Sequence, residues 1–189
     1  MVPDQMPVLE TERLALRPFA PTDAKRVQEL AGERDVASRT LNIPYPYPDG
    51  AAEQWIATHA EAFRQGALLA LGITPRSDGS LVGAISLASV NKTHARAELG
   101  YWVGRPCWNK GYCTEAARAL IEYGFTHLNL NRIEATHLVW NPASGRVMQK
   151  LGMTREGLLR QYVSNRGTRE DVIMYSILRR EFEATERTV

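Results

Sequence analysis

Hydrophobic and polar positions alternate with two different periodicities along the chain, which we call the strand rhythm and the helical rhythm. A repeat of two residues is typical of half-buried strands, and a repeat of three to four residues is typical of amphipathic helices. The strand rhythm covers residues 9–19, 67–74, 81–90, 95–103, 132–140, 154–163 and 171–178. The helical rhythm covers residues 22–31, 51–65, 114–128 and 142–151. This order predicts an α/β fold, with a mixed sheet flanked by about four helices in a single domain over residues 1–189.

Residues that favour turns separate these segments. Thr22 is a candidate N-cap for the first helix, and Gly152 is a natural C-cap for the fourth. Residues 42–50 contain three prolines, which exclude regular structure and favour an extended loop. Because long loops often line functional sites, we consider Tyr45 and Tyr47 in this loop to be candidate substrate contacts.

The net charge is nearly balanced, since 23 Lys and Arg oppose 21 Asp and Glu to give +2. A protein that coats nucleic acid normally shows a basic run or stripe, whereas the basic residues here are scattered. We therefore expect no nucleic acid as a direct ligand. The apolar runs are also far shorter than the ~20 residues of a membrane span, so we expect a soluble protein without a membrane partner.

Cysteine and histidine usage favours the cytoplasm and gives no sign of a metal. Cys107 and Cys113 are the only cysteines, and two residues cannot form a disulfide framework. No Cys or His pair completes a zinc site, and the four histidines lack metal-ligand spacing. The first six residues include an acid and no basic region before an apolar stretch, so we expect no signal peptide.

Residues 108–116 connect a predicted strand to a predicted helix. Backbone N–H groups at this position, together with the helix dipole, can bind an anion. Gly111 would let the backbone approach such an anion closely, since it has no side chain to obstruct it. The glycine spacing matches neither a Walker A loop nor a dinucleotide-binding motif. By itself, the loop equally fits a tight turn and a capped helix that bind nothing.

Four short stretches occur in an order that resembles one protein family; they are residues 100–103, 108–116, 141–144 and 150–153. This ordered set resembles the GNAT superfamily of acyl-CoA-dependent N-acetyltransferases. More narrowly, it is similar to the RimJ/RimL branch, which includes ribosomal-protein N-terminal acetyltransferases. Residues 11–17 and 171–178 also fit, so the resemblance spans nearly the whole chain. It implies a mostly antiparallel sheet whose fourth and fifth strands splay apart to admit the pantetheine arm of acetyl-CoA.

The resemblance also assigns residues to acetyl-CoA. Backbone groups of Tyr101, Trp102 and Val103 would contact the pantetheine and the acetyl carbonyl. Asn141 would hydrogen-bond the pantetheine, and Ser144 would lie near the sulfur. Both residues also fit a simple helix cap without any ligand. The pyrophosphate would bind the loop formed by Trp108, Asn109, Lys110, Gly111, Tyr112, Cys113 and Thr114.

Three positions depart from the family pattern. Trp108 and Cys113 stand at the first and last positions of the pyrophosphate motif, where Gln or Arg and Gly or Ala are usual. The RimJ/RimL branch often has an aromatic residue at the first position, and cysteine is small, so we expect the anion cradle to persist. Met148 stands where many members carry a tyrosine that protonates the thiolate. This difference moves the acid role to Ser144 or to water.

Glu98 is the candidate general base. Alternation along the strand puts it on the face opposite Tyr101 and Val103. The matching region of the family often supplies a glutamate that takes the proton of the amine, frequently through water. Glu98 equally fits a solvated partner of Arg96 or Arg105.

The resemblance implies an acetyl-CoA-dependent N-acetyltransferase that transfers the acetyl group directly to a primary amine. The leading acceptor is the α-amine of a protein or peptide N-terminus. The alternatives are a small amine (a polyamine, an amino acid or an aminoglycoside) and a non-catalytic acyl-CoA sensor. No Cys–His pair accompanies Cys113, so we expect no covalent intermediate. Family members are monomers or homodimers, and the sequence leaves both open.

Overall fold

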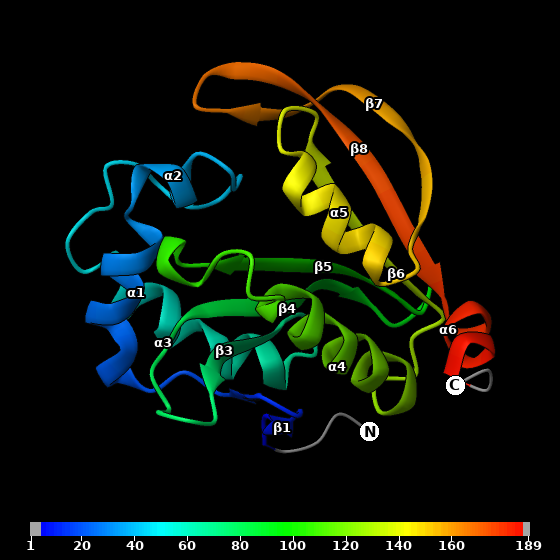
Figure 1. Cartoon of the computed structure of the whole chain (residues 1–189), viewed down its shortest axis with the longest axis horizontal. Coiled ribbons are helices and arrows are strands. Elements are labelled where there is room, and N and C mark those ends of the chain that lie inside the picture. Colours follow the sequence, from blue (N-terminus) through cyan, green and yellow to red (C-terminus); the bar gives the residue numbers. More distant parts are fainter. Residues whose placement is uncertain (1–4, 187–189) are drawn as a thin grey trace.

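The structure, a computed structural model that describes residues 5–186, is organised around one eight-stranded sheet (Figure 1). β5 and β6 are parallel and all other neighbouring strands are antiparallel, which confirms the predicted mixed, mostly antiparallel sheet. The order across the sheet is β1-β2-β3-β4-β5-β6-β8-β7. The strands are β1 (Leu9–Glu10), β2 (Leu14–Arg17), β3 (Leu69–Pro75), β4 (Gly83–Asn91), β5 (Arg96–Val103), β6 (Arg132–Leu138), β7 (Thr154–Asn165) and β8 (Thr168–Leu178).

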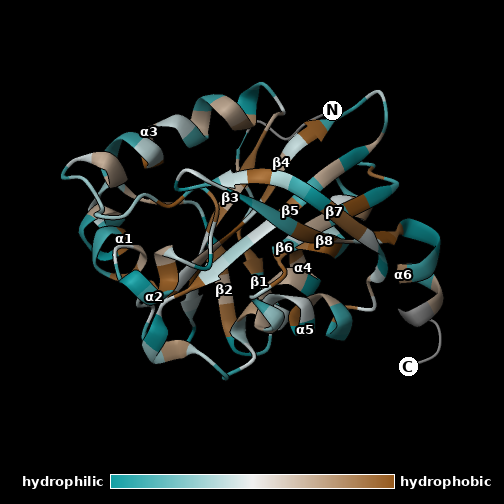
Figure 2. Ribbon diagram, turned by 90° about the horizontal axis from the view of Figure 1, so that it is seen from above, coloured by the Kyte–Doolittle hydropathy of each residue, from teal (hydrophilic) through white to brown (hydrophobic). Residues whose placement is uncertain are grey.

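Helices cover both faces of the sheet (Figure 2). The six helices of the described residues are α1 (Ala24–Ala31), α2 (Arg34–Ala37), α3 (Ala51–Arg64), α4 (Tyr112–Thr126), α5 (Pro142–Lys150) and α6 (Arg179–Glu186). α1 and α3 pack on one face of β3, β4 and β5, and α4 packs on the other face with α5 beside it on β6. The four predicted helices correspond to α1, α3, α4 and α5. The short α2 and the terminal α6 were not expected from the sequence pattern.

The predicted strand over residues 9–19 is in fact two strands. Thr11 closes a turn, since its backbone N–H donates to Leu14 O at 2.9 Å and its hydroxyl accepts from Leu14 N at 3.0 Å. β1 therefore folds back on β2, with Leu9 opposite Leu16. Alternation alone does not reveal such a turn, because the hydrophobic rhythm continues through it.

The prediction that Thr22 caps the first helix is wrong. Pro21–Asp23 forms a 3-10 turn, and α1 begins after Asp23. The Asp23 carboxylate accepts from Ala20 N at 2.8 Å and pairs with Arg17 at 2.7 Å, so it fixes the entry to the helix. Gly152 follows α5 with a φ of 75°, as expected for a helix end.

Alternate side chains of β5 belong to two different hydrophobic clusters. Leu99 and Val103 are buried in the larger cluster, which joins the sheet to α4. Trp102 packs against the smaller cluster, which joins the sheet to α1 and α3. The central strand β5 is therefore held from both faces.

β5 and β6 pair at three register positions only, from Arg96–Arg132 to Glu98–Glu134. Beyond Glu98 the two strands separate, which confirms the predicted splay of the central strands. They are the fifth and sixth strands here because residues 9–19 form two strands. The separation opens toward the C-terminal end of β5, and the chain enters α4 from there.

Among residues 5–186, no helix is both long and apolar enough to cross a membrane. Residues 1–4, on which the expectation about a signal peptide partly rests, lie outside the described part of the chain.

Candidate active site

A cavity of about 270 Å³ lies where β5 and β6 diverge. Residues 98–102 of β5 form one wall, and residues 136–138 of β6 face them. Residues 39–43, which follow α2, close a further side. Asn141 and Ser144, at the start of α5, also line the cavity. The splay therefore brings together candidate residues that lie far apart in the sequence.

The hydrogen-bond ladder decides which backbone groups of β5 face this cavity. Successive residues of a strand direct their backbone groups alternately to its two neighbours. On the β6 side, Arg132 N donates to Ala95 O at 3.1 Å. On the β4 side, Gly104 N donates to Val82 O at 2.9 Å. Odd-numbered residues of β5 therefore direct their N–H and C=O groups toward β6 and the cavity.

This alternation separates the three residues expected to present backbone groups. The backbone of Tyr101 faces the cavity, and that of Val103, just beyond the lining residues, is directed to the same side of β5, whereas the backbone of Trp102 faces Ala84 of β4. The expected backbone contact from Trp102 is therefore corrected, although Trp102 still lines the cavity. The indole N–H of Trp108 donates to Val103 O at 2.7 Å, which leaves the Val103 N–H for a ligand.

The loop before α4 has the conformation of an anion-binding turn. Asn109 and Gly111 have φ angles of 61° and 81°, and Gly111 is the N-cap residue. No side chain of the described residues caps this helix, so the N–H groups of residues 112–114 remain open to a ligand. A Cβ on Gly111 would meet only Arg13 Nη2, at 3.3 Å. These features fit a pyrophosphate at the N-terminus of α4.

Arg13 supports this loop and was missed by the sequence analysis. Its Nη1 donates to Lys110 O at 3.0 Å, and its Nε donates to Glu115 at 2.7 Å. Glu115 also accepts from the Thr11 hydroxyl at 2.6 Å. The start of β2 is thereby fixed to the first turn of α4. Residues 11–17 carry part of the family resemblance, but nothing in the sequence connects Arg13 to a loop 97 residues away.

Asn141 has one amide atom in use and one without a partner. Its Nδ2 donates to Arg39 O at 3.3 Å. Its Oδ1 is buried and accepts no hydrogen bond from the described residues. Although Asn141 is the N-cap residue of α5, its side chain makes no capping bond, so the simple helix-cap interpretation is wrong. A buried acceptor in a cavity wall fits an amide N–H of pantetheine.

Ser144 and Tyr101 form a hydroxyl pair across the cavity. The Tyr101 hydroxyl lies 3.0 Å from Ser144 Oγ and donates to Ser144 O at 3.1 Å. Burial raises the pKa of Tyr101, so its hydroxyl remains protonated. Met148 is buried beside them and has no proton to donate. The pair therefore supplies the O–H groups that Met148 cannot.

Glu98 lines the cavity, and its carboxylate has no hydrogen-bond or ion-pair partner among residues 5–186. Arg96 pairs with Glu134 at 2.7 Å, and Arg105 pairs with Asp35 at 3.2 Å. The interpretation of Glu98 as a surface partner of either arginine is therefore wrong. Desolvation in the cavity wall raises the pKa of Glu98, and the negative charge of Glu134 raises it further.

Cys113 lies in the first turn of α4 as a free thiol. Burial raises its pKa to about 12, which keeps it neutral and makes it a poor nucleophile. Within the described part of the chain, no group of three or more His, Cys, Asp or Glu side chains is arranged to hold a metal ion.

Tyr45 and Tyr47, the candidate substrate contacts, lie outside the lining of the cavity. Tyr47 packs against the cluster between α1 and α3, where burial raises its pKa, and Tyr45 is 48% exposed. The preceding residues 39–43 take the expected position instead. Proline content indicated the loop but not which part of it faces inward.

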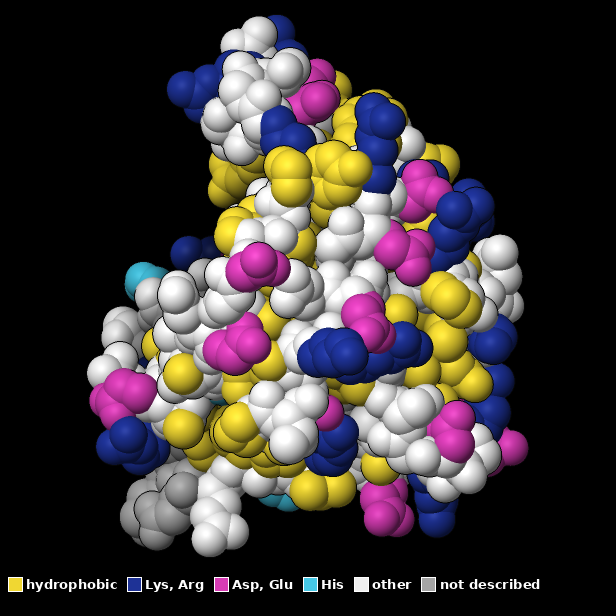
Figure 3. All heavy atoms as spheres, turned by 90° about the vertical axis from the view of Figure 1, so that its left-hand side faces the viewer, with side chains coloured by type: hydrophobic (Ala, Val, Ile, Leu, Met, Phe, Trp, Pro, Cys, Tyr) yellow, Lys and Arg dark blue, Asp and Glu magenta, His cyan; other side chains and the backbone are white. Residues whose placement is uncertain are grey.

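The tip of the β7–β8 hairpin contacts the same segment. Arg166 Nη2 donates to Ala37 O at 2.7 Å and to Ile43 O at 3.1 Å. Figure 3 shows the tip projecting at this end of the molecule, where acidic and basic side chains are interspersed. The hairpin tip does not line the cavity but holds the segment that does.

Comparison with known proteins identifies a family. The model of the acetyltransferase (GNAT) domain matches residues 13–154. The uncharacterized N-acetyltransferase p20 of Bacillus licheniformis is 35% identical over 178 residues, which cover 94% of this chain and 99% of p20.

Relatives with more specific names differ in their acceptors. The putative ribosomal N-acetyltransferase YdaF of Bacillus subtilis is 31% identical, and the match covers 91% of this chain and 94% of YdaF. A spermidine N(1)-acetyltransferase of Escherichia coli is 30% identical, with 59% of this chain and 60% of that protein covered. Among solved structures, a probable acetyltransferase superposes with a TM-score of 0.83 at 30% identity, covering 94% of this chain and 99% of that one.

Proposed function

Because the chain belongs to the GNAT acetyltransferase family, and so is an acetyl-CoA-dependent N-acetyltransferase, we propose that its acceptor is the α-amine of a protein or peptide N-terminus. The proposal includes the RimJ/RimL branch and a cytoplasmic location. It draws support from the similarity to YdaF over nearly the full length of both chains. The match to the spermidine enzyme covers a smaller part of each chain.

The charges of the cavity wall carry the proposal. Among the described residues, Glu98 is the one carboxylate that lines the cavity, and Arg39, whose guanidinium lies over the Trp108 ring, adds a positive charge to the same lining. A polyamine carries several positive charges and needs several carboxylates, so this wall suits it poorly. A peptide N-terminus carries a single amine followed by amide groups. Neutral polar groups such as Thr40, Asn42 and Thr136 line the same cavity and can bond those amides.

The amine must lose a proton before it attacks. The Glu98 carboxylate is the acceptor for this proton, because no ion pair occupies it and its raised pKa makes it a stronger base. Acetyl-CoA, when bound, supplies the acetyl group as a thioester. Tyr101 directs its backbone groups into the cavity, and Val103 directs its own to the same side of β5, so these two residues are the candidates to polarise a carbonyl there.

The leaving side of the reaction needs a proton donor. The Ser144 hydroxyl rotates freely and can donate into the cavity while Tyr101 donates to Ser144. Transfer is direct in this scheme, since the neutral Cys113 thiol takes no part as a nucleophile. The hydroxyl pair also counts against the alternative of a non-catalytic sensor, because it supplies O–H groups although Met148 stands at the position of the usual tyrosine.

The acceptor is tested with a mixture of amines. Purified protein and acetyl-CoA are incubated with peptides beginning with Ser, Ala or Thr, with spermidine, with free amino acids and with an aminoglycoside. We expect mass spectrometry to show one acetyl group on the α-amine of a peptide, and none on the matched peptide whose N-terminus is formylated. Labelling of spermidine or the aminoglycoside without any peptide would overturn the proposal.

The base is tested with Glu98→Gln. We expect kcat to fall about 100-fold or more at neutral pH, the lower end of what general acid–base catalysis contributes. The affinity for acetyl-CoA should stay close to that of the unchanged protein. An unchanged kcat would show that another group, or water alone, takes the proton.

A further inference from the structure

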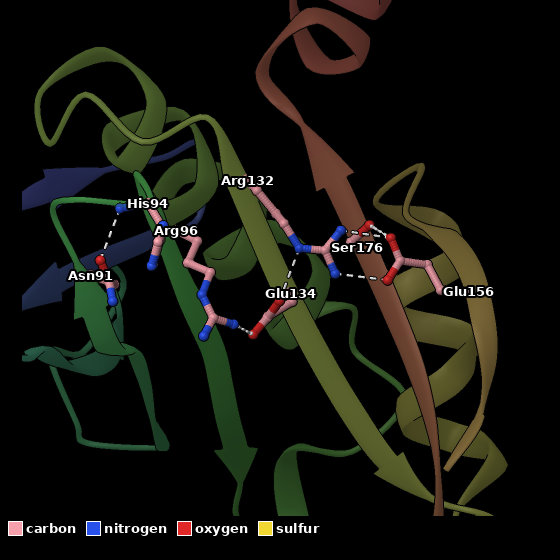
Figure 4. Close-up of polar contacts among 7 residues, drawn as sticks. All are labelled: Asn91, His94, Arg96, Arg132, Glu134, Glu156 and Ser176. Atoms are coloured by element: carbon pink, nitrogen blue, oxygen red, sulfur yellow. Dashed lines mark hydrogen bonds and ion pairs between the residues drawn. The ribbon is translucent and has the colours of Figure 1, made fainter.

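Charged side chains form a continuous bridge between β5 and β6 (Figure 4). One of them, Glu134, is the register partner of Glu98. The Glu134 carboxylate accepts from Arg96 Nη1 at 2.7 Å through one oxygen. Its other oxygen accepts from Arg132 Nε at 2.9 Å. Two guanidinium groups therefore donate to the single carboxylate of Glu134.

The bridge continues to the last two strands of the sheet. Arg132 donates to both oxygens of Glu156 on β7, at 2.6 and 2.7 Å. Ser176 on β8 donates to Glu156 at 2.7 Å. Arg132 is thereby fixed in orientation by bonds on both sides, as Figure 4 shows. A side chain held in this way keeps its Nε directed at Glu134.

The bridge lies at the closed end of the cavity. Glu98 and Glu134 are register neighbours in the pair of parallel strands, so their side chains lie on the same face about 5 Å apart at the backbone. Glu98 is the last β5 residue to pair with β6 before the strands diverge. The two carboxylates thus differ in surroundings, since one is bridged by arginines and the other faces the cavity.

The groups that face Glu98 can be named from each neighbouring element. β6 contributes Glu134, and β5 itself contributes Arg96, two positions along the same face. β4 places the uncharged Ala88 opposite Glu98. The cavity wall adds Arg39 and His137, while α3 contributes Trp55, which carries no charge. Glu134 is the negative group nearest to Glu98 in the register. The extent to which the arginines offset the charge of Glu134 therefore controls the electrostatic field at Glu98.

We propose that Glu134 and Arg96 are positioning residues that set the charge state of Glu98. The Arg96–Glu134–Arg132 bridge offsets part of the negative charge of Glu134 and so leaves Glu98 as the carboxylate that accepts the proton of the acceptor amine. In that step the N–H bond of the ammonium breaks, the proton bonds to a Glu98 carboxylate oxygen, and the electron pair remains on nitrogen. The inference rests on the proposed role of Glu98 as the base.

Two substitutions should shift the pH dependence in opposite directions. Arg96→Gln removes a positive charge from Glu134, so Glu98 feels more negative charge and is protonated at higher pH. The acid limb of the pH–rate profile then moves up by about half a pH unit, which is the order expected for one charge at this distance in a partly solvated site. Glu134→Gln removes the negative charge beside Glu98 and leaves Arg96 without its partner, while Arg132 stays paired with Glu156, so the limb moves down by a similar amount.

The experiment records kcat and kcat/KM against pH with one acceptor peptide for the full chain, the two variants and Glu98→Gln. Arg26→Gln is the matched control. Arg26 and Glu29 form an exposed ion pair with an N–O distance of 3.1 Å, and neither residue lines the cavity. Arg96→Lys keeps the charge and should return the limb to its original position. Thermal unfolding shows whether each variant is folded.

Each outcome is decisive. Opposite shifts support the inference. If both variants lose activity by a constant factor at every pH, or shift in the same direction, the bridge is only structural and the inference is wrong. Should Glu134→Gln fail to fold, the comparison of Arg96→Gln with Arg96→Lys still decides. If Glu98→Gln keeps the acid limb, the base assignment itself fails, and this result is separate from the behaviour of the bridge.

Discussion

Two walls of the active-site cavity are held by different kinds of contact. The wall formed by β5 and the loop before α4 is built on a strand ladder and a buried core, with Leu99 and Val103 packed beneath it. The wall formed by residues 39–43 belongs to no strand or helix. It is held by polar bonds from distant residues, namely Arg166 to Ile43 O and Asn141 to Arg39 O.

This difference separates the two substrates. The wall formed by β5 and the loop before α4, here called the ladder wall, carries the groups that fit acetyl-CoA, and its many cooperative contacts make it rigid. The wall formed by residues 39–43, here called the loop wall, faces the acceptor side, and a few bonds decide its position. We therefore expect substitutions in one wall to affect acetyl-CoA and substitutions that free the other to affect the acceptor.

The largest effect should come from Gly111→Val in the ladder wall. A branched side chain at this N-cap blocks the approach of an anion to the first turn of α4. We expect the affinity for acetyl-CoA to fall about 1,000-fold, as for the loss of two charge-assisted hydrogen bonds of about 2 kcal/mol each. Isothermal titration calorimetry measures this change.

Gly50→Val is the matched control for Gly111→Val. Gly50 is the N-cap residue of α3, and its φ of 78° is close to the 81° of Gly111. No atom lies within 4 Å of a Cβ at Gly50. Both variants should lose about 1–2 kcal/mol of stability from the strained backbone. If Gly50→Val weakened acetyl-CoA binding equally, backbone strain and not the blocked anion site would explain the loss.

A smaller effect is expected from Ser144→Ala at the junction of the two walls. The variant removes the O–H group that donates into the cavity, so kcat should fall about 100-fold while acetyl-CoA affinity changes little. Tyr101→Phe should cost less. The double variant should be no slower than Ser144→Ala, because Tyr101 acts through Ser144. Steady-state kinetics and calorimetry on the same preparations separate the two quantities.

Ser86→Ala provides the control for Ser144→Ala, because Ser86 lines the same cavity and donates no hydrogen bond to the described residues. It should leave kcat nearly unchanged. Equal losses of kcat and affinity in Ser144→Ala would mean that Ser144 only positions the cofactor.

Sequence reasoning worked well for the ladder wall because its information is local. Alternation located β3, β4 and β5 within a few residues, and the loop with Gly111 starts a helix as predicted. The splay and the mostly antiparallel sheet followed from the resemblance. The choice of Trp102 as a backbone contact was wrong. Whether the backbone N–H and C=O of a residue point to one neighbouring strand or to the other depends on how the strands pair, and the sequence of a single strand does not reveal the pairing.

The loop wall was predicted poorly because its contacts are long-range. Arg166 and Ala37 are 129 residues apart, and Arg13 and Lys110 are 97 apart. A lone arginine in a turn gives no sign of a backbone carbonyl that it will meet. Tyr47 was chosen from loop composition, which does not distinguish a ring that faces a cavity from one that packs between helices.

The smallest effect should come from Arg166→Gln at the hairpin tip. The variant removes two bonds to backbone carbonyls, at Ala37 and Ile43, so residues 39–43 lose part of their support. We expect KM for the acceptor peptide to rise about 5- to 10-fold, since exposed charged hydrogen bonds contribute about 1 kcal/mol in total after solvent competition. KM for acetyl-CoA should stay constant, and so should both constants in Arg169→Gln, a control in the same hairpin. A parallel rise in both KM values would show that the two walls are mechanically coupled and that the contrast between them does not extend to function.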